Sequence, residues 1–179
     1  MAKASESKLA KQFLAQAVHL LQEVHLPRIE SCLAALKGGE VWWRPNAASN
    51  SVGNLVLHLN GNLGQWIVAA LGGAPDRRVR DQEFAERGPI PTRHLRARLH
   101  KTVFQACRVL EGLSQRDLWR PLTIQGFRVT GLEAIFHAVE HFSHHTGQIV
   151  LLTKQQKGRD LGFTSLPGER KTRRGLPAV

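Results

Sequence analysis

The chain has 179 residues, of which 42% are hydrophobic, and this supply of apolar side chains is sufficient for one domain with its own core. It carries 25 Lys and Arg against 14 Asp and Glu, a formal net charge of +11, and neither of its two cysteines lies in a CxxC spacing. These features exclude a disulfide framework and favour a reducing cytoplasm, and without a signal core or a run of about 18 apolar residues we expect a protein that is neither secreted nor membrane-spanning.

The first predicted helix runs from about Ser7 to Lys37 and ends at Gly38-Gly39. Pro27 lies inside it. Because proline removes a backbone donor and clashes with the preceding turn, we expect a kink or a short break there. Apolar residues recur along this helix at helical spacing: Leu9, Phe13, Val18, Leu21, Val24, Ile29, Leu33 and Leu36.

The second predicted helix covers about Val52 to Leu71, and Gly72-Gly73 and Pro75 end it. Residues 74–91 form the longest connection in the chain, which is polar, charged and bounded by prolines. A connection of this length between the second and third helices of a bundle predicts a crossover rather than a tight antiparallel turn.

The third predicted helix opens at Thr92 and runs to about Leu113. Between Leu118 and Val129, alternating apolar and polar residues around Gln125-Gly126 predict a short β-hairpin. Because an isolated two-stranded ribbon is weak, this hairpin must pack on the helices.

The fourth predicted helix begins with a capping box, in which Thr130 is the N-cap and Glu133 follows three residues later, and it runs to about Lys154. An irregular basic tail is expected from about residue 158. The predicted fold class is therefore all-α: a four-helix bundle with a long crossover between helices 2 and 3 and a short β-hairpin before helix 4. We expect one domain spanning residues 1–179.

Two histidines on the fourth predicted helix, His141 and His145, are four residues apart. Positions i and i+4 lie about 40° apart around a helix and one turn apart along it, so both imidazoles can reach one divalent metal ion. On a helical wheel both lie beside the apolar arc and face a groove between helices. His137 continues the row one turn earlier and further outward, and His144 points further out again.

Two ligands make a loose site, and the best candidate for a third is His58, on the flank of the apolar stripe of the second helix. Three neutral imidazoles leave at least one coordination position open, which is typical of a catalytic metal site. Metal-bound imidazoles also need a partner for the other ring nitrogen. The candidates for such supporting roles are Asn62, His137, Glu140 and Gln148.

A purely structural interpretation stands beside this one. Histidine pairs at helical spacing occur by chance on exposed faces, and a single histidine at the edge of an apolar stripe is usually only partly buried. The remaining histidines lack such company, and we expect them to be ordinary surface or boundary residues: His19, His25, His94 and His100. The cysteines are expected to fill the core.

Other chemistry finds little support in the sequence. There is no Ser-His-Asp order, phosphate loop or dinucleotide-binding glycine pattern, and the fourth helix lacks the paired carboxylates of a di-iron bundle. No carboxylate is placed by spacing beside the three histidines, so no general base is assigned. Because no aromatic residues interleave with the basic ones, nucleic-acid binding is kept only as a minor alternative to a solvated basic surface.

Two motifs resemble the DinB-like superfamily of small bacterial three-histidine metalloproteins. One is Ser-Val-Gly-Asn-Leu at 51–55 leading into His-Leu-Asn-Gly-Asn at 58–62, and the other is Glu-His at 140–141 followed by His-Thr-Gly-Gln-Ile at 145–149. The resemblance implies an up-down-down-up four-helix bundle in which three histidines hold a divalent metal, commonly zinc or nickel. The matching positions are His58, His141 and His145. Homodimers are common in the superfamily.

Characterised members of that superfamily include thiol S-transferases and a thiol-dependent maleylpyruvate isomerase, which use low-molecular-weight thiols. The resemblance therefore implies a metal-dependent enzyme whose open metal position binds a thiol or water, and whose substrate is unknown. Arg44 is a candidate contact for a thiol that carries a carboxylate. The alternative is a non-catalytic metal-binding or partner-binding bundle, in which the metal clamps the second and fourth helices together.

Overall fold

The computed structural model describes residues 2–163, with side chains from residue 7 onward. A π-helical segment interrupts the first predicted helix: α1 spans Ala2–His19, η1 spans Leu20–His25 and α2 spans Leu26–Ala35. Pro27 lies in the first turn of α2, directly after the π-helical segment, and as a proline it lacks the N–H that a continuous helix would use there. The break expected at this proline is therefore confirmed as a local change of helical winding.

The second predicted helix is also built from two parts. The 3-10 segment η2 (Glu40–Trp42) lies in the preceding loop, α3 spans Val52–Leu63, and the π-helical η3 continues it over Gly64–Ala69. Ser51 and Asn54 form a reciprocal cap at the start of α3, because each side chain accepts a hydrogen bond from the other residue's backbone N–H. The third predicted helix is α5, Thr92–Gly112.

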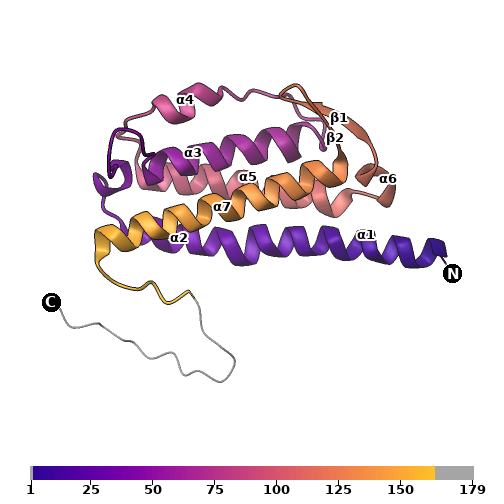
Figure 1. The fold of residues 1–179 in the computed structure, drawn as a ribbon, viewed down its shortest axis with the longest axis horizontal. Helices are drawn as coiled ribbons and strands as arrows, with labels where there is room; N and C mark the ends of the chain where they lie inside the picture. The colour runs from indigo at the N-terminus through magenta and orange to yellow at the C-terminus, as the bar shows by residue number, and fades with distance from the viewer. Residues whose placement is uncertain (1, 164–179) are drawn as a thin grey trace, which may run out of the picture.

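The long connection between α3 and α5 contains a helix that the polar sequence did not predict. This helix, α4, spans Arg80–Ala85 and packs against α3 (Figure 1). Its only buried residue is Glu83. A six-residue segment without an apolar stripe gives no periodic signal, so α4 could not be recognised from its own residues.

The predicted hairpin and the fourth helix are present. After the short helix α6 (Gln115–Leu118), β1 (Pro121–Ile124) and β2 (Phe127–Thr130) pair antiparallel with Leu122 opposite Val129. Gln125 and Gly126 both have positive φ, as a two-residue hairpin turn requires. The last helix, α7, spans Gly131–Lys157 with Thr130 as N-cap, and its expected capping box with Glu133 is confirmed.

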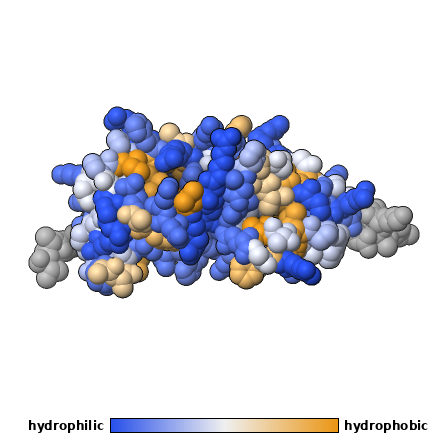
Figure 2. Space-filling view, turned by 90° about the horizontal axis from the view of Figure 1, so that it is seen from above, coloured by the Kyte–Doolittle hydropathy of each residue, from blue (hydrophilic) through white to orange (hydrophobic). Residues whose placement is uncertain are grey.

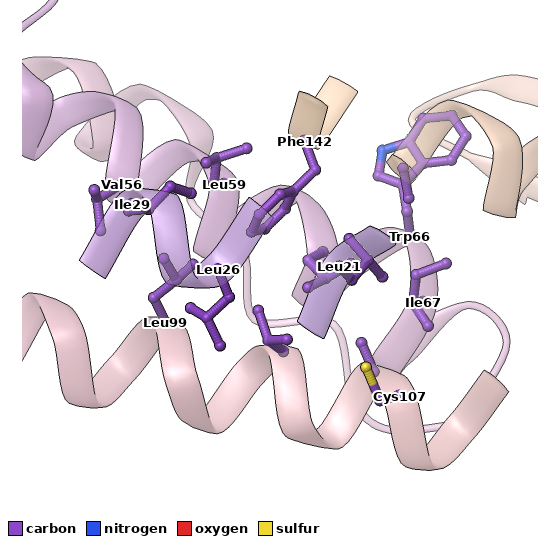
Figure 3. Packing of buried hydrophobic residues seen from close by; sticks show 14 of the residues in the cluster. Leu21, Leu26, Ile29, Val56, Leu59, Trp66, Ile67, Leu99, Cys107 and Phe142 are labelled. Atoms are coloured by element: carbon purple, nitrogen blue, oxygen red, sulfur yellow. The ribbon is translucent and has the colours of Figure 1, made fainter. Parts of the chain in front are cut away.

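The core lies where the long helices meet. α3 packs against α5 and α7, and α2 packs against the same two helices. Figure 3 shows Leu59, Phe142 and Leu99 directed into this shared interior from α3, α7 and α5. Both cysteines, Cys32 and Cys107, are buried and unpaired, as expected for core fillers.

His25 departs from the expectation of a surface or boundary residue, because only 6% of it is exposed. It ends the π-helical segment and its ring lies against Phe142, at a centroid distance of 6.2 Å. The wider π-helical turn rotates the following side chains relative to an α-helical wheel, which explains why the sequence periodicity misplaced this histidine.

The face seen in Figure 2 is mostly hydrophilic, and hydrophobic residues form small separate patches on it. Within residues 2–163, no helix combines the length and apolar character that crossing a membrane would need. Of the expected irregular tail, residues 158–163 follow α7 without regular structure, and the rest lies outside the described residues.

Candidate metal centre

Three imidazoles converge between α3 and α7. His58 comes from α3, and His141 and His145 come from consecutive turns of α7. One ring nitrogen from each lies within 4.8 Å of the other two. The ring centroids are 4.8 Å apart for His58 and His141, 4.9 Å for His58 and His145, and 4.5 Å for His141 and His145. The structure thus brings together the three histidines that the sequence singled out.

Two of the three ring nitrogens are already close enough to bind one divalent cation. Nε2 of His58 and Nε2 of His141 are 3.0 Å apart. Two imidazole nitrogens bound to one zinc ion in tetrahedral geometry, each at about 2.0–2.1 Å, lie about 3.3–3.4 Å from each other, so this pair is near the separation that a shared ion requires. Three neutral nitrogen donors suit zinc or nickel better than the hard cations that prefer oxygen.

A buried carboxylate orients His58. Glu83 Oε2 lies 2.8 Å from Nδ1 of His58, and because an ionised carboxylate only accepts hydrogen bonds, the ring proton belongs on Nδ1. The Nε2 lone pair then faces the other two histidines. A carboxylate on the far nitrogen of a ligating imidazole is a common support of protein metal sites.

Arg78 fixes this carboxylate from the other side. Its Nε donates to Oε1 of Glu83 at 2.8 Å, and its Nη2 donates to Oε2 at 3.0 Å. Burial opposes ionisation of Glu83, but the hydrogen bonds from His58 and Arg78 outweigh it and hold the pKa of Glu83 below its ordinary value. Glu83 is therefore an anion at neutral pH.

The neighbouring backbone is shaped to admit Glu83. A Cβ atom on Gly61 of α3 would overlap Oε1 of Glu83, so only glycine leaves room there. The buried Asn54 side chain holds α4 in place by donating to the carbonyls of Glu83 and Glu86, at 2.8 and 2.9 Å.

Arg44 does not take the role that the sequence suggested for it. It donates to Oδ1 of Asn54 at 2.8 Å and to the carbonyl of Phe84 at 3.3 Å. Its guanidinium therefore ties the loop before α3 to α4 and does not line the pocket beside the imidazoles.

Of three other residues expected to support the imidazoles, one is hydrogen-bonded to an imidazole within residues 7–163 and two are not. Oε1 of Gln148 lies 2.7 Å from Nδ1 of His145, one turn along α7. Glu140 is exposed, and among the described residues no hydrogen bond joins it to an imidazole. Asn62 is buried and lines the adjacent pocket. Nδ1 of His141 is buried without a hydrogen-bond partner in the described part of the chain.

His137 lies beside the three rather than among them. Its ring packs against Trp66 at a centroid distance of 4.0 Å, with the two planes tilted by 39°, and is 5.5 Å from the ring of His141. Burial is the main reason that the pKa of His137 is lowered, and the charge of Glu140 partly offsets this effect.

Burial favours the neutral forms of His141 and His145. It lowers the pKa of His141 to about 3, and positive charge on the neighbouring His145 and His58 acts in the same direction. The pKa of His145 is also lowered, mainly by burial, although its hydrogen bond to Gln148 opposes the shift. Near pH 7 protons therefore compete weakly with a metal ion for these two rings.

A pocket of about 500 Å³ opens beside His58 and His141. Its walls come from α3 and η3, from α4 with the residues before it, from the hairpin and from the first half of α7. The other lining residues are Asn62, Trp66, Arg78, Arg80, Gln125, Phe127, Arg128, Val129, Glu133 and His137. A small molecule in this pocket would reach two of the three imidazoles.

Sequence comparison places the chain in one described family. The family model described as "Protein of unknown function (DUF1572)" matches residues 8–170. None of the curated proteins matches the sequence.

Solved structures show the same fold. A DinB-like protein (YjoA) from Bacillus subtilis has 20% sequence identity and a TM-score of 0.60, over 87% of this chain and 96% of that one. A DinB-like protein from Bacillus cereus has 17% identity and a TM-score of 0.59, over 84% and 95%. A conserved protein from Enterococcus faecalis has 19% identity and a TM-score of 0.63, over 86% and 98%. The fold is therefore DinB-like.

Proposed function

The chain belongs to the family described as "Protein of unknown function (DUF1572)", and from this premise we propose that it is a divalent-metal-dependent enzyme. His58, His141 and His145 hold the metal, with zinc or nickel as the expected ion. The observation that carries the proposal is the convergence of three imidazole nitrogens, within 4.8 Å of one another, beside a pocket of about 500 Å³. The reaction class that we favour is thiol-dependent S-transfer or a related hydrolysis or isomerisation.

The chain's own residues prepare this chemistry. When bound, a divalent ion with three protein ligands supplies a Lewis acid and lowers the pKa of a thiol or water. Glu83 holds the proton of His58 on Nδ1, so the lone pair of Nε2 stays available to bind a metal ion. Gln148 does the same for His145 through a neutral amide oxygen. Glu83 is already engaged by Arg78 and His58, so it is a positioning residue rather than a free general base.

The finer architecture belongs to the same proposal. The long helical segments form an up-down-down-up bundle in one domain, with the connection at residues 74–91 returning the chain so that α3 and α5 run parallel. Two contacts support this arrangement. Arg120, beyond α5, donates to the carbonyls of Ala70 and Leu71 at the end of η3, and Lys157 at the end of α7 pairs with Glu40 before α3. Assembly as a homodimer stays a prediction.

A non-catalytic clamp is the alternative role for the metal, because the three histidines link α3 to α7. The pocket beside His58 and His141 favours the enzyme, since a purely structural site has no need of a lined cavity. Chelation separates the two roles. If metal removal lowers the unfolding temperature and no thiol perturbs the metal-loaded protein, the clamp is supported instead.

Metal analysis of the purified protein is the direct test. We expect close to one divalent ion per chain, and we expect His58→Ala and His145→Ala each to lose it, because two imidazoles bind weakly. His144→Ala is the matched control: its ring is on the same helix beside His145 and outside the group of three. Full metal retention in both ligand variants would reject this site.

A further inference from the structure

The pocket beside the imidazoles has an apolar side. Trp66 of η3 is 5% exposed, whereas Phe127 of β2 is 62% exposed, so one aromatic ring forms a wall and the other stands at the rim. Val129 of β2 adds an aliphatic surface. A ligand with a flat or aliphatic body would lose water on this side of the pocket.

Some of the charged side chains around the pocket have hydrogen-bond partners, and others have no ion-pair partner among the described residues. Arg78 is neutralised by its two hydrogen bonds to Glu83. The Glu133 carboxylate accepts from the backbone N–H and the hydroxyl of Thr130, at 2.7 and 2.8 Å, and so caps α7. Two arginines remain, Arg80 of α4 and Arg128 of β2, and in the part of the chain that the structure describes no carboxylate lies within 4.0 Å of either.

Arg80 is held without losing its donors. Its guanidinium carbon lies 5.0 Å from the centroid of the Phe84 ring, a stacking contact that leaves the N–H groups available. An arginine fork matches the two oxygens of a carboxylate or phosphate, and such charge-assisted hydrogen bonds are stronger than neutral ones.

The hairpin that carries Arg128 is joined to the metal centre. Nε2 of Gln125, at its turn, donates to Oε1 of Gln65, which also accepts from Nη1 of Arg78. Arg78 in turn holds Glu83 against His58. One hydrogen-bonded network therefore sets the position of the arginine-bearing hairpin relative to the imidazoles.

We propose that this pocket binds an organic anion, in which a carboxylate or phosphate is attached to an apolar body. Arg80 and Arg128 bind the anionic group, Trp66 and Phe127 contact the body, and the reacting atom lies toward His58 and His141. This substrate class rests on the proposed function for its chemistry. Recognition of the anion, however, depends on the arginines alone and can be measured without metal.

The test uses the chelator-treated full-length protein, so that no ion can hold the anion. Phenylacetate, phenyl phosphate and the neutral phenylacetamide are titrated in turn and followed by NMR chemical shifts. We expect at least one anion to bind roughly tenfold more tightly than the amide, because charge-assisted hydrogen bonds are the larger contribution. The tighter of the two anions identifies the head group.

Amino-acid substitutions test which residues cause the preference for an anion over the neutral amide. Arg80→Gln and Arg128→Gln should each weaken binding of the preferred anion about three- to tenfold and leave amide binding unchanged. Phe127→Ala should weaken all three probes to a similar extent. Arg93→Gln is the matched control, because it removes the same charge from an exposed site on α5 outside this pocket.

Two results would overturn the proposal. One is equal binding of anions and amide, or an effect of Arg93→Gln as large as that of the pocket variants. The other is an anion preference that arises only after zinc is added, which would assign recognition to the ion and leave the proposed metal site intact. A preference that persists in a protein unable to bind zinc would support the anion site while rejecting the metal.

Discussion

The three imidazoles differ in what holds the nitrogen that faces away from the other rings. His58 has an ionised carboxylate, His145 has a neutral amide, and the corresponding nitrogen of His141 has no hydrogen-bond partner among the described residues. A carboxylate partner increases the basicity of an imidazole and fixes its orientation more strongly than an amide does. Of the three imidazoles, His58 is therefore the one whose strength as an electron-pair donor to a metal would depend most on a residue outside the group, namely Glu83.

Replacing Glu83 by glutamine tests this dependence at nearly constant volume. Glu83→Gln should weaken metal binding about 10- to 100-fold, because the amide keeps the shape but loses the charge that holds the His58 proton. Competition with a chromophoric chelator measures the affinity. Asp81→Asn is the control, since Asp81 is an exposed carboxylate on the same short helix. Equal affinities in wild type and Glu83→Gln would show that the carboxylate does not support the site.

At the scale of elements, helical periodicity was sufficient for the long helices and for the histidine row. Residues that recur every three or four positions predicted α3, α5 and α7, and the same geometry placed His141 beside His145. The role of Glu83 was not predicted, because its burial follows from a contact between α4 and α3. The sequence of α4 has no apolar stripe from which that contact could be inferred. Local patterns therefore predicted the three histidines that the structure brings together but could not predict the carboxylate beside His58.

A glycine on α3 connects this element to the site. Gly61→Ala should push Glu83 away from His58, because the added methyl group overlaps Oε1, and metal affinity should fall by about tenfold or more. Gly64→Ala, one turn further, is the matched control: its Cβ would meet only Thr102 Cγ2, at 3.9 Å. That variant should keep its affinity and gain up to about 1 kcal/mol of stability, because alanine favours a helix.

Chelator competition and thermal unfolding of the two glycine variants would be compared side by side. Unchanged metal affinity in Gly61→Ala would mean that Glu83 can move without disturbing His58. Loss of affinity in both variants would point to a general effect on α3 rather than to the carboxylate.

At the scale of the whole molecule, the candidate centre joins parts of the chain that are far apart in sequence. α3 and α7 supply the imidazoles, α4 supplies the carboxylate, and the hairpin reaches the same network through Gln125. Several titratable groups are therefore buried close together in the folded protein, whereas in the unfolded chain they are exposed and far apart. The stability of the metal-free protein must then depend on pH.

The direction of that dependence follows from His141. Its pKa is about 3 in the folded protein and 6.5 ordinarily, so the unfolded chain binds the proton more readily. Its contribution to stability is complete above pH 6.5 and is lost progressively as the pH falls toward 3. The lowered pKa values of His25, His137 and His145 act in the same direction. Glu83, with its lowered pKa, adds a loss below about pH 4.5.

We therefore expect the free energy of unfolding of the chelator-treated protein, measured in urea at pH 7.5, 6.5, 5.5 and 5.0, to fall below about pH 6.5. His141→Gln should flatten this fall, because it removes the buried imidazole that resists protonation most strongly, whereas the neighbouring His144→Gln should not. The comparison is made within each variant's own pH series, so an overall loss of stability in His141→Gln does not matter. A fall of the same steepness in wild type and His141→Gln would show that burial of this imidazole does not make the fold sensitive to acid.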